Sequence, residues 1–537
     1  MKGVLALLLL GTIQAQTPVP PASETIEVSI VNVDVVVTDR HGNHVRGLTA
    51  ADFEIRDHGA VQPITNFAEY RDEQPRAAPS PAPTAAAVPR PAAAPPQKRT
   101  LVLFVEHQYL SPWQADSFVA TMKKLLHDTV RPGDSAAVVS FVYTTKVEQD
   151  FTGDLAQLDA AVDRLRPLFD RWGAKRTESE AIQNEYLQEV LERATRESRA
   201  AAAASLVLNG EAMGVRQMVD IRRKVYTLNM LVNMMAGADG RKAVFLATQR
   251  FGKYAGFEYW GRGLLELNSN MPFFLTDDLR DGLTRNANAA GVTFYPIYPQ
   301  GFVELPSVSA ERSSASKDPA KPDGILMNET ISIGELADRT GGVGGWGMKD
   351  VEKIANAMRD DLSSYYSLAF RAPKGVSNHK ITVTTTEGGY TVRARHEFVV
   401  KTDDMKMSDR ILAALYQPQK ASLIPVDVQV LDKKKLKRGY SIPIVIRIPA
   451  SSLTALPDKN GRSGAFRVYA AAGGPLGINS DVNQRSQPFT IPAGAKDAAT
   501  KIFTYSFEMR LDTRSDRIVI GIYDELSKQY GIVRVKI

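Results

Sequence analysis

The pattern of hydrophobic and polar positions divides the N-terminal part of the chain into a β module and a spacer. Between residues 24 and 72, β-branched apolar runs with partial alternation are separated by turns at Gly42 and Gly59. This pattern predicts a small N-terminal β module of the sandwich type. Residues 73–98 are almost entirely Pro, Ala and a few polar residues, a composition that buries too little apolar surface to fold. We therefore expect an extended Pro/Ala-rich linker there.

From residue 99 onward, apolar runs of strand length alternate with amphipathic helical stretches. Uninterrupted apolar runs are typical of central parallel strands, because helices cover both faces of such a sheet. The alternation predicts a doubly wound, Rossmann-like α/β domain over residues 99–362. The expected strands are residues 100–105, 136–141, 243–248 and 291–298, with a strand pair between residues 144 and 151. The expected helices are residues 111–127, 154–165, 278–290, 331–340 and 350–362.

A long insertion, at about residues 169–235, interrupts this domain and is rich in Ala, Glu, Arg and Met. Strong helix formers predict helices that pack on the domain. The alternative is an adaptable partner-binding surface, since Met tolerates irregular contacts. After the domain, residues 363–400 return to short strands, and residues 410–537 alternate strands and turns like a second, C-terminal β-sandwich. The sequence leaves open whether the N-terminal β module packs on residues 363–400.

The N-terminus has the layout of a secretory signal peptide, which is expected to end near residue 15. Lys2 precedes a short apolar run at residues 4–10, and small and polar residues follow. The run is too short for a membrane span, which takes about 20 apolar residues, and no other segment is apolar enough. We therefore expect an exported chain, periplasmic, cell-surface or secreted, with no membrane span in its mature form.

Composition excludes several classes of chemistry. The 537-residue chain contains no cysteine, which rules out disulfides, thiol catalysis and Cys-ligated zinc. Its net charge of +6 is small, and the basic run at residues 433–438 is interpreted as a solvated turn before a strand rather than a nucleic-acid patch. His41, His44 and His58 fall in turns and are interpreted as water-exposed rather than as a metal site.

Motifs for catalysis are absent from the sequence. Residues 342–347 formally match G-x-G-x-x-G, but they follow a predicted helix instead of a strand, so they are interpreted as a flexible loop. There is no G-x-S-x-G elbow, no Walker A motif and no H-E-x-x-H. We therefore predict no catalytic residues and a protein that is not an enzyme.

Several sequence blocks, taken in order and spacing, resemble the von Willebrand factor type A (vWA)-related family found in many copies in acidobacterial genomes. They extend over nearly all of the mature chain. The blocks are residues 35–39, 47–53, 106–112, 131–134, 149–152, 240–243, 295–297, 336–342 and 362–366. The resemblance implies a vWA-like α/β domain, and in typical members this domain binds a divalent cation at the carboxyl edge of its sheet.

That cation site, called MIDAS, uses Asp-x-Ser-x-Ser after the first strand, a Thr from a later loop and an Asp after the fourth strand. Hard Mg²⁺ prefers an octahedral set of oxygen ligands, and one open position accepts an acidic group from a partner. The matching positions in this chain are Glu106, Gln108 and Leu110 for the first motif, with Ser111 one position late, Thr177 for the Thr and Gln249 for the later Asp.

These residues depart from the family's pattern. Leu110 offers no ligand, Gln108 and Gln249 offer only amide oxygens, and the neighbouring Arg250 would add positive charge if it pointed inward. Ser111 could replace one ligand or equally cap the following helix. The resemblance therefore implies a degenerate MIDAS that binds Mg²⁺ or Ca²⁺ poorly, and no cofactor is expected.

Together these features predict an exported, non-enzymatic protein-interaction or adhesion protein with an unidentified protein partner. Two alternatives remain open. The first is a cation-dependent adhesin with a variant MIDAS, in which Glu106, Thr177 and Gln249 converge. The second is an enzyme or enzyme accessory with an unrecognised site in the helical insertion.

Overall fold

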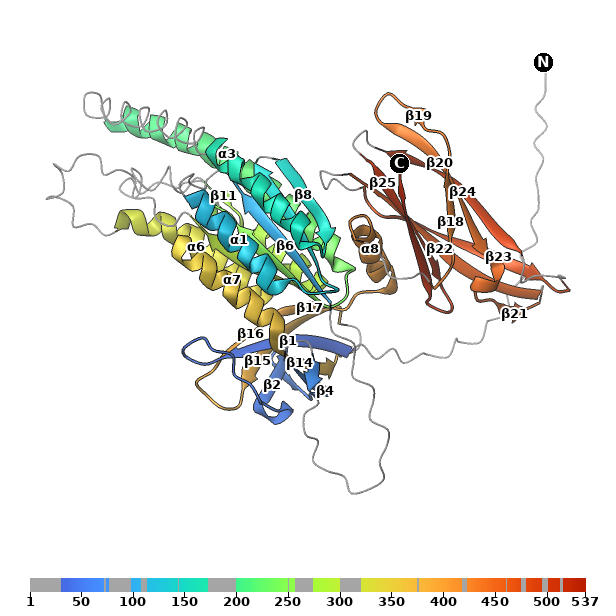
Figure 1. Ribbon diagram of the computed structural model, residues 1–537, viewed down its shortest axis with the longest axis horizontal. Helices are drawn as coiled ribbons and strands as arrows, with labels where there is room; N and C mark the ends of the chain where they lie inside the picture. The colour runs from blue at the N-terminus through green and yellow to red at the C-terminus, as the bar shows by residue number, and fades with distance from the viewer. Residues whose placement is uncertain are drawn as a thin grey trace, which may run out of the picture.

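The protein is a mixed α/β structure with several sheets, one of which contains parallel strands (Figure 1). The computed structural model describes residues 30–71, 74–76, 98–107, 114–142, 144–171, 199–249, 251–255, 274–299, 320–373, 376–417, 423–459, 461–474, 480–494, 501–511 and 515–537. The expected signal peptide and most of the Pro/Ala-rich linker lie outside these residues. Within them, no helix combines the length and apolar character needed to cross a membrane.

Segments on either side of the α/β region build a first β-sandwich together. Strand β1 (Ile30–Thr38) pairs with β14 (Ser364–Arg371), and β2 (Phe53–Asp57) pairs with β15 (Asn378–Thr385). Alternate side chains of these strands form one apolar core. An isolated hairpin is marginal in water, so each segment needs the other to bury its apolar face. The N-terminal module therefore does pack on residues 363–400.

The remaining elements of this sandwich lie at its edges. They are the 3-10 turn η1 (Ala50–Asp52), β3 (Ala60–Gln62), β4 (Asn66–Arg71), β5 (Gln74–Arg76), β16 (Thr391–Ala394) and β17 (Glu397–Val399). The sheet orders are β16-β1-β14-β4-β5 and β17-β15-β2-β3. Strand β5 corrects the sequence prediction, because its residues were assigned to the linker but pair with β4.

The central sheet has the order β13-β12-β9-β6-β7-β8, and only the β7–β8 pair is antiparallel. Numbered by position in the chain, this order is 3-2-1-4-5-6, the order of doubly wound nucleotide-binding sheets. The strands are β6 (Arg99–Glu106), β7 (Ser135–Val142), β8 (Thr144–Thr152), β9 (Arg241–Ala247), β12 (Val292–Tyr298) and β13 (Gly345–Trp346), and a separate small pair is β10 (Tyr254–Ala255) with β11 (Phe274–Leu275).

Helices cover both faces of this sheet, as the continuous apolar strands predicted. On β6, Leu101 and Leu103 belong to one core cluster, whereas Val102 and Phe104 belong to the other. The first cluster is completed by α1 (Ala115–Thr129), the helix at residues 155–171 and α7 (Met348–Ser363), and the second by α3 (Arg199–Ala236), α5 (Asp277–Ala290) and α6 (Ala320–Thr340). The predicted helical insertion thus contributes α3 as part of the covering layer.

The glycine-rich segment at residues 342–347 is part of the sheet, which corrects its interpretation as a flexible loop. Gly345 and Trp346 form β13, which pairs in parallel with the end of β12. A Cβ atom on Gly342 would lie 1.9 Å from the Phe294 carbonyl oxygen, and one on Gly345 would lie 2.8 Å from Ile354 Cγ1. These glycines therefore permit close packing between the edge strand and its neighbours.

Asp361, at the end of α7, joins the first sandwich to the α/β domain. Its carboxylate accepts two hydrogen bonds from Arg393, at 2.6 and 2.7 Å, and one from the Tyr295 hydroxyl at 2.9 Å. Nε2 of His44 lies 3.1 Å from it, and the His44 side chain is only 14% exposed. His44 is therefore not the water-exposed turn residue that the sequence suggested. Burial acts to raise the pKa of Asp361, but His44 and Arg393 outweigh it, and the pKa is lowered.

A helix that the sequence analysis missed, α8 (Asp403–Ala414), precedes the C-terminal sandwich. At its start, the Thr402 hydroxyl accepts a hydrogen bond from the Met405 backbone amide at 3.2 Å. This N-cap gives a hydrogen-bond partner to one amide of the first helical turn. The sequence predicts strands and turns from residue 410 onward, but residue 410 lies within α8.

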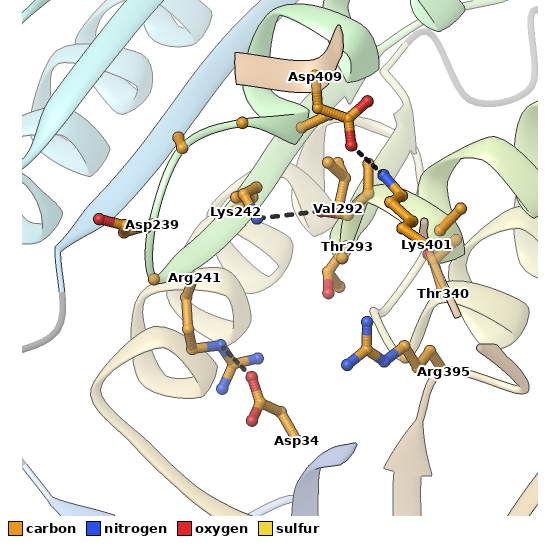
Figure 2. A pocket seen from close by; sticks show the side chains of 18 of the residues that line it. Asp34, Asp239, Arg241, Lys242, Val292, Thr293, Thr340, Arg395, Lys401 and Asp409 are labelled. Carbon is orange, nitrogen blue, oxygen red and sulfur yellow. Dashed lines mark hydrogen bonds and ion pairs between the residues drawn. The ribbon is translucent and has the colours of Figure 1, made fainter. Parts of the chain in front are cut away.

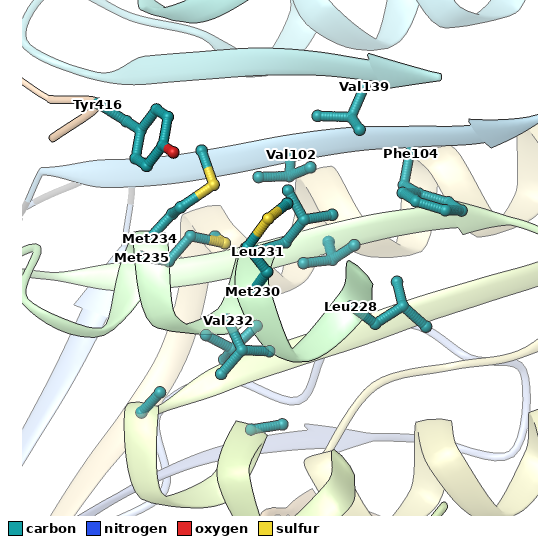
Figure 3. Close-up of a cluster of buried hydrophobic side chains, with 14 of the residues drawn as sticks. Val102, Phe104, Val139, Leu228, Met230, Leu231, Val232, Met234, Met235 and Tyr416 are labelled. Carbon is teal, nitrogen blue, oxygen red and sulfur yellow. The ribbon is translucent and has the colours of Figure 1, made fainter. Parts of the chain in front are cut away.

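The C-terminal sandwich consists of two sheets and shares a core with the α/β domain through α8. Met407 and Ile411 of α8 lie in the same apolar cluster as α3 and as Tyr469 and Val519 of the sandwich. Figure 3 shows Tyr416 beside the methionines at the end of α3. One sheet contains β18 (Asp427–Val430), β19 (Lys434–Lys435), β20 (Tyr440–Pro449) and β24 (Ile502–Leu511), and the other contains β21 (Leu456–Asp458), β22 (Gly461–Gly473), β23 (Asn483–Pro492), β25 (Arg517–Asp524) and β26 (Tyr530–Lys536), with the 3-10 turn η4 (Ala450–Ser452) between β20 and β21.

Candidate functional site

The candidate site lies at the carboxyl edge of the central sheet, between β6 and β9. These strands are parallel neighbours, so Glu106 at the end of β6 and Thr248 and Gln249 just after β9 come together. This point is also where the winding of the sheet reverses direction, because β7 and β8 lie on one side and β12 and β13 on the other. In open α/β sheets, ligands bind at such a switch point.

Glu106 is fixed in this edge by hydrogen bonds from the segment that follows β9. Its side chain is buried, and Oε2 accepts hydrogen bonds from the Thr248 hydroxyl at 2.8 Å and from the Gln249 backbone amide at 3.0 Å. Both donors approach the same carboxylate oxygen. The second oxygen, Oε1, is therefore the one left for a cationic partner.

That partner is Lys224 of α3. Its Nζ lies 3.0 Å from Glu106 Oε1 and also donates a hydrogen bond to the backbone carbonyl of Gln249. The Lys224 and Glu106 side chains are 2% and 0% exposed. Two buried charges lose their hydration, and only close pairing with further hydrogen bonds compensates for that loss. An internal ammonium group therefore neutralises the carboxylate at the switch point.

Sequence reasoning missed Lys224, although the pattern around it holds a signal. Ile221 and Leu228 are both buried, and Lys224 lies on the same helix face, three residues after Ile221 and four residues before Leu228. A lysine within the apolar stripe of a helix must reach water or find a buried acid. Its partner is identifiable only from the fold, because Glu106 lies on a different element.

The residue after Glu106, His107, is a second buried polar side chain at this edge, but its ring lies with the apolar cluster on the other face of the sheet. The His107 ring is fully buried and packs edge-on against Phe169, with centroids 5.0 Å apart. Burial, with a smaller contribution from Lys146, lowers the pKa of His107 to about 3, so the imidazole is neutral at physiological pH. Within the described part of the chain, neither ring nitrogen of His107 has a hydrogen-bond partner, and the same holds for Nε2 of Gln249.

The structure brings together two of the six residues predicted for the degenerate MIDAS. Glu106 and Gln249 meet at the sheet edge, but through the Gln249 backbone rather than its side chain. The other four predicted positions, and Arg250, lie outside the described residues: Gln108, Leu110, Ser111 and Thr177. In the described ranges, no group of three or more His, Asp or Glu side chains is placed to hold a metal ion.

In the described part of this edge, the Glu106 carboxylate is held by hydrogen bonds and already has a cationic partner. Comparison with known proteins adds no assignment: no protein-family model matches the chain, and no curated protein is significantly similar to it.

Proposed function

We propose that this chain is an exported, non-enzymatic interaction or adhesion protein, whose vWA-like α/β domain contacts its partner without a bound metal. The strand order of the central sheet, with a single antiparallel strand β8, supports a doubly wound domain of this kind. The vWA-like assignment itself rests on the resemblance of the sequence blocks.

The observation that carries the metal-free part of the proposal is the contact between Lys224 and Glu106. A divalent cation bound to Glu106 would lie within a few ångströms of the Lys224 ammonium. At about 4 Å and an effective dielectric constant of about 20, a double and a single positive charge repel by roughly 8 kcal/mol. Cation binding would therefore require Lys224 to leave its buried position.

A protein partner is supported by the way the parts are joined. Helix α8 packs on α3 and on strands β22 and β25, so the C-terminal sandwich and the α/β domain share one apolar core. Figure 1 shows the α/β domain and the C-terminal sandwich side by side, with α8 between them. A body of this kind presents broad surfaces in a fixed arrangement, which suits recognition of a macromolecule.

The first test is a thermal melt of the mature protein with EDTA, Mg²⁺, Ca²⁺ or Mn²⁺ at millimolar concentration. We expect the same midpoint in all four conditions. A ligand at 100 times its Kd that binds only the folded state adds about 2.7 kcal/mol, which is a visible shift. A shift that Glu106→Ala abolishes would contradict the metal-free proposal and would favour the cation-dependent adhesin.

The second test addresses the partner. Tagged protein is cross-linked in the cells that produce it, and the envelope fraction is then prepared in EDTA or in Mg²⁺. The proposal expects a specific heteromeric product that forms equally in both conditions. Absence of any such product, together with turnover of a substrate by the purified chain, would replace the interaction proposal with the enzyme alternative.

A further inference from the structure

A second charged site lies at the opposite edge of the central sheet, where the three parts of the protein meet. It is a cavity of about 300 Å³, next to the first residues of β9 and β12 (Figure 2). The first sandwich contributes Asp34 and Arg395 to its wall, and the segment leading into α8 contributes Lys401. This site is separate from Glu106, which lies at the carboxyl ends of the strands.

The cavity is strongly basic. Seven Lys or Arg residues and only three Asp residues line it, an excess of four formal positive charges. Some of these cations are compensated: Arg393 forms its two bonds to Asp361, Lys401 lies 2.5 Å from Asp409, and Arg241 lies 3.8 Å from Asp34. The positive charge that no carboxylate compensates is therefore carried by the remaining lining cations.

Three of the lining cations form no ion pair among the described residues. Arg410 stacks on the Tyr530 ring, 4.5 Å from its centroid, and the other two are Lys242 and Arg395. Lys242 donates a hydrogen bond to the Ala290 carbonyl at 3.0 Å, and Arg395 donates to the carbonyls of Asn288 and Asn32 at 3.3 and 2.5 Å. Both face the same small space, since Arg395 Nη1 and Lys242 Nζ lie 3.3 and 3.9 Å from the position that a Cβ on Gly291 would occupy.

The charged groups around Lys242 show that its positive charge is poorly matched. Burial is the main cause that lowers the pKa of Lys242 to about 8, and Arg395 and Lys401 lower it further. Asp409 and Asp239 act in the opposite direction but are outweighed. Burial also lowers the pKa of Arg395. An anion between these two cations would relieve this repulsion.

We propose that this cavity binds a compact polyanion, a small molecule with phosphate or carboxylate groups, whose oxygens bridge Lys242 and Arg395. Guanidinium groups match the geometry of phosphate and carboxylate oxygens, and ammonium supplies an additional point charge. A volume of about 300 Å³ is at the lower end for small-molecule sites, which limits the ligand to a compact molecule. The proposal is independent of the proposed function, because it involves none of the residues around Glu106.

The competing role for these two cations is to cap the carboxyl end of α5. Asn288 and Ala290 belong to its last turn, and their carbonyls accept the hydrogen bonds described above. The end of a helix carries only about half a negative charge, however, so it offsets a minor part of two full positive charges. The capping role thus leaves charge available for a ligand.

The test is the melting midpoint of the mature protein in sulfate, phosphate, pyrophosphate or citrate, compared with chloride at equal ionic strength. We expect the melting midpoint to rise with anion concentration. Lys242→Met and Arg395→Gln should each abolish this rise, whereas the matched surface variant Lys459→Met should retain it. Comparison of pyrophosphate with citrate distinguishes a phosphate ligand from a carboxylate ligand. No rise with any of these anions, or an unchanged rise in both cavity variants, would overturn the proposal and leave α5 capping as their role.

A second measurement uses the unaltered protein, in case the variants fold poorly. Lys242 is acetylated with acetic anhydride with and without the most stabilising anion, or with citrate and pyrophosphate if none stabilises, and its modification is followed by peptide mass spectrometry. A bound anion should protect Lys242 several-fold while leaving Lys459 equally reactive. Equal modification of Lys242 in the presence and absence of anion would contradict the proposed site.

Discussion

Removal of the Lys224 ammonium should destabilise the α/β domain far more than loss of an exposed ion pair. The Lys224→Met substitution keeps most of the side-chain volume but leaves the Glu106 carboxylate buried. Among the described residues, the hydrogen bonds from Thr248 and Gln249 then remain to compensate its charge. Loss of one partner of a buried ion pair costs about 3–5 kcal/mol. Glu106→Gln should cost a similar amount, because it removes the carboxylate that lies 3.0 Å from the buried ammonium.

The double variant Glu106→Gln/Lys224→Met removes both charges together. Replacement of a whole buried pair by neutral groups is often close to neutral in stability. We therefore expect the double variant to be more stable than either single variant, with a coupling energy of several kcal/mol between the two positions. This pattern would show that the two charges compensate each other and not merely that each fills space.

The assay is urea denaturation of the mature protein, with the transition of the α/β domain compared among the four members of the cycle at equal m-value. Lys124→Met is the matched control, since Lys124 pairs with Asp128 on the surface of α1 and its loss should change stability by less than about 0.5 kcal/mol. A cost below about 1 kcal/mol for Lys224→Met, or single costs that simply add in the double variant, would refute the reasoning.

Three further predictions concern the joints between the parts. Ile411→Ala should cost about 2–5 kcal/mol and separate the unfolding of the C-terminal sandwich from that of the α/β domain in calorimetry, because Ile411 is fully buried in their shared core. Asp361→Asn should lower the free energy of unfolding at pH 7, where the ionised carboxylate binds His44 and Arg393. Because the pKa of Asp361 is lowered in the folded protein, this stabilisation is present above about pH 4 and is lost as the pH falls through the folded-state pKa. A difference in stability between variant and unaltered protein that persists unchanged at pH 2 would contradict this prediction. Sulfate, which keeps its charge at these pH values, should bind the basic cavity more weakly as the pH rises through about 8, because Lys242 then loses its proton; calorimetric titration at pH 7 and pH 9 measures this, and equal affinity would exclude Lys242 as a contact.

Local hydrophobic patterns correctly predicted the strands and helices in which the apolar positions of the sequence are the buried positions of the structure. The apolar run at residues 100–105 indicated a central strand covered on both faces, and β6 is buried along its whole length. The coarse fold class, a mixed α/β protein with a sheet of parallel strands, is confirmed by the same reasoning. Helix α8 was missed because its N-cap signal at Thr402 precedes only a short helix, and the strands that follow dominated the pattern.

Local hydrophobic patterns do not predict which strands pair when the strands are far apart in the sequence. Strand β1 and strand β14 lie more than three hundred residues apart, and each reads only as a strand with a buried face. Which strand covers that face depends on loop closure across the entire α/β domain. His44 was interpreted as exposed for the same reason, since Asp361 reaches it only after the domain has folded.

The sequence by itself determined the type and order of the longer strands and helices of the α/β domain, because hydrophobic periodicity is a local property that each segment carries alone. The resemblance to the vWA-related family also placed Glu106 and Gln249 at one sheet edge, where the structure has the ends of the parallel strands β6 and β9. Only the tertiary structure decided that Lys224 pairs with Glu106 and that Lys242 and Arg395 share a cavity. Electrostatic partners are set by distance in space and by burial, and neither quantity is encoded in the spacing of residues along the chain.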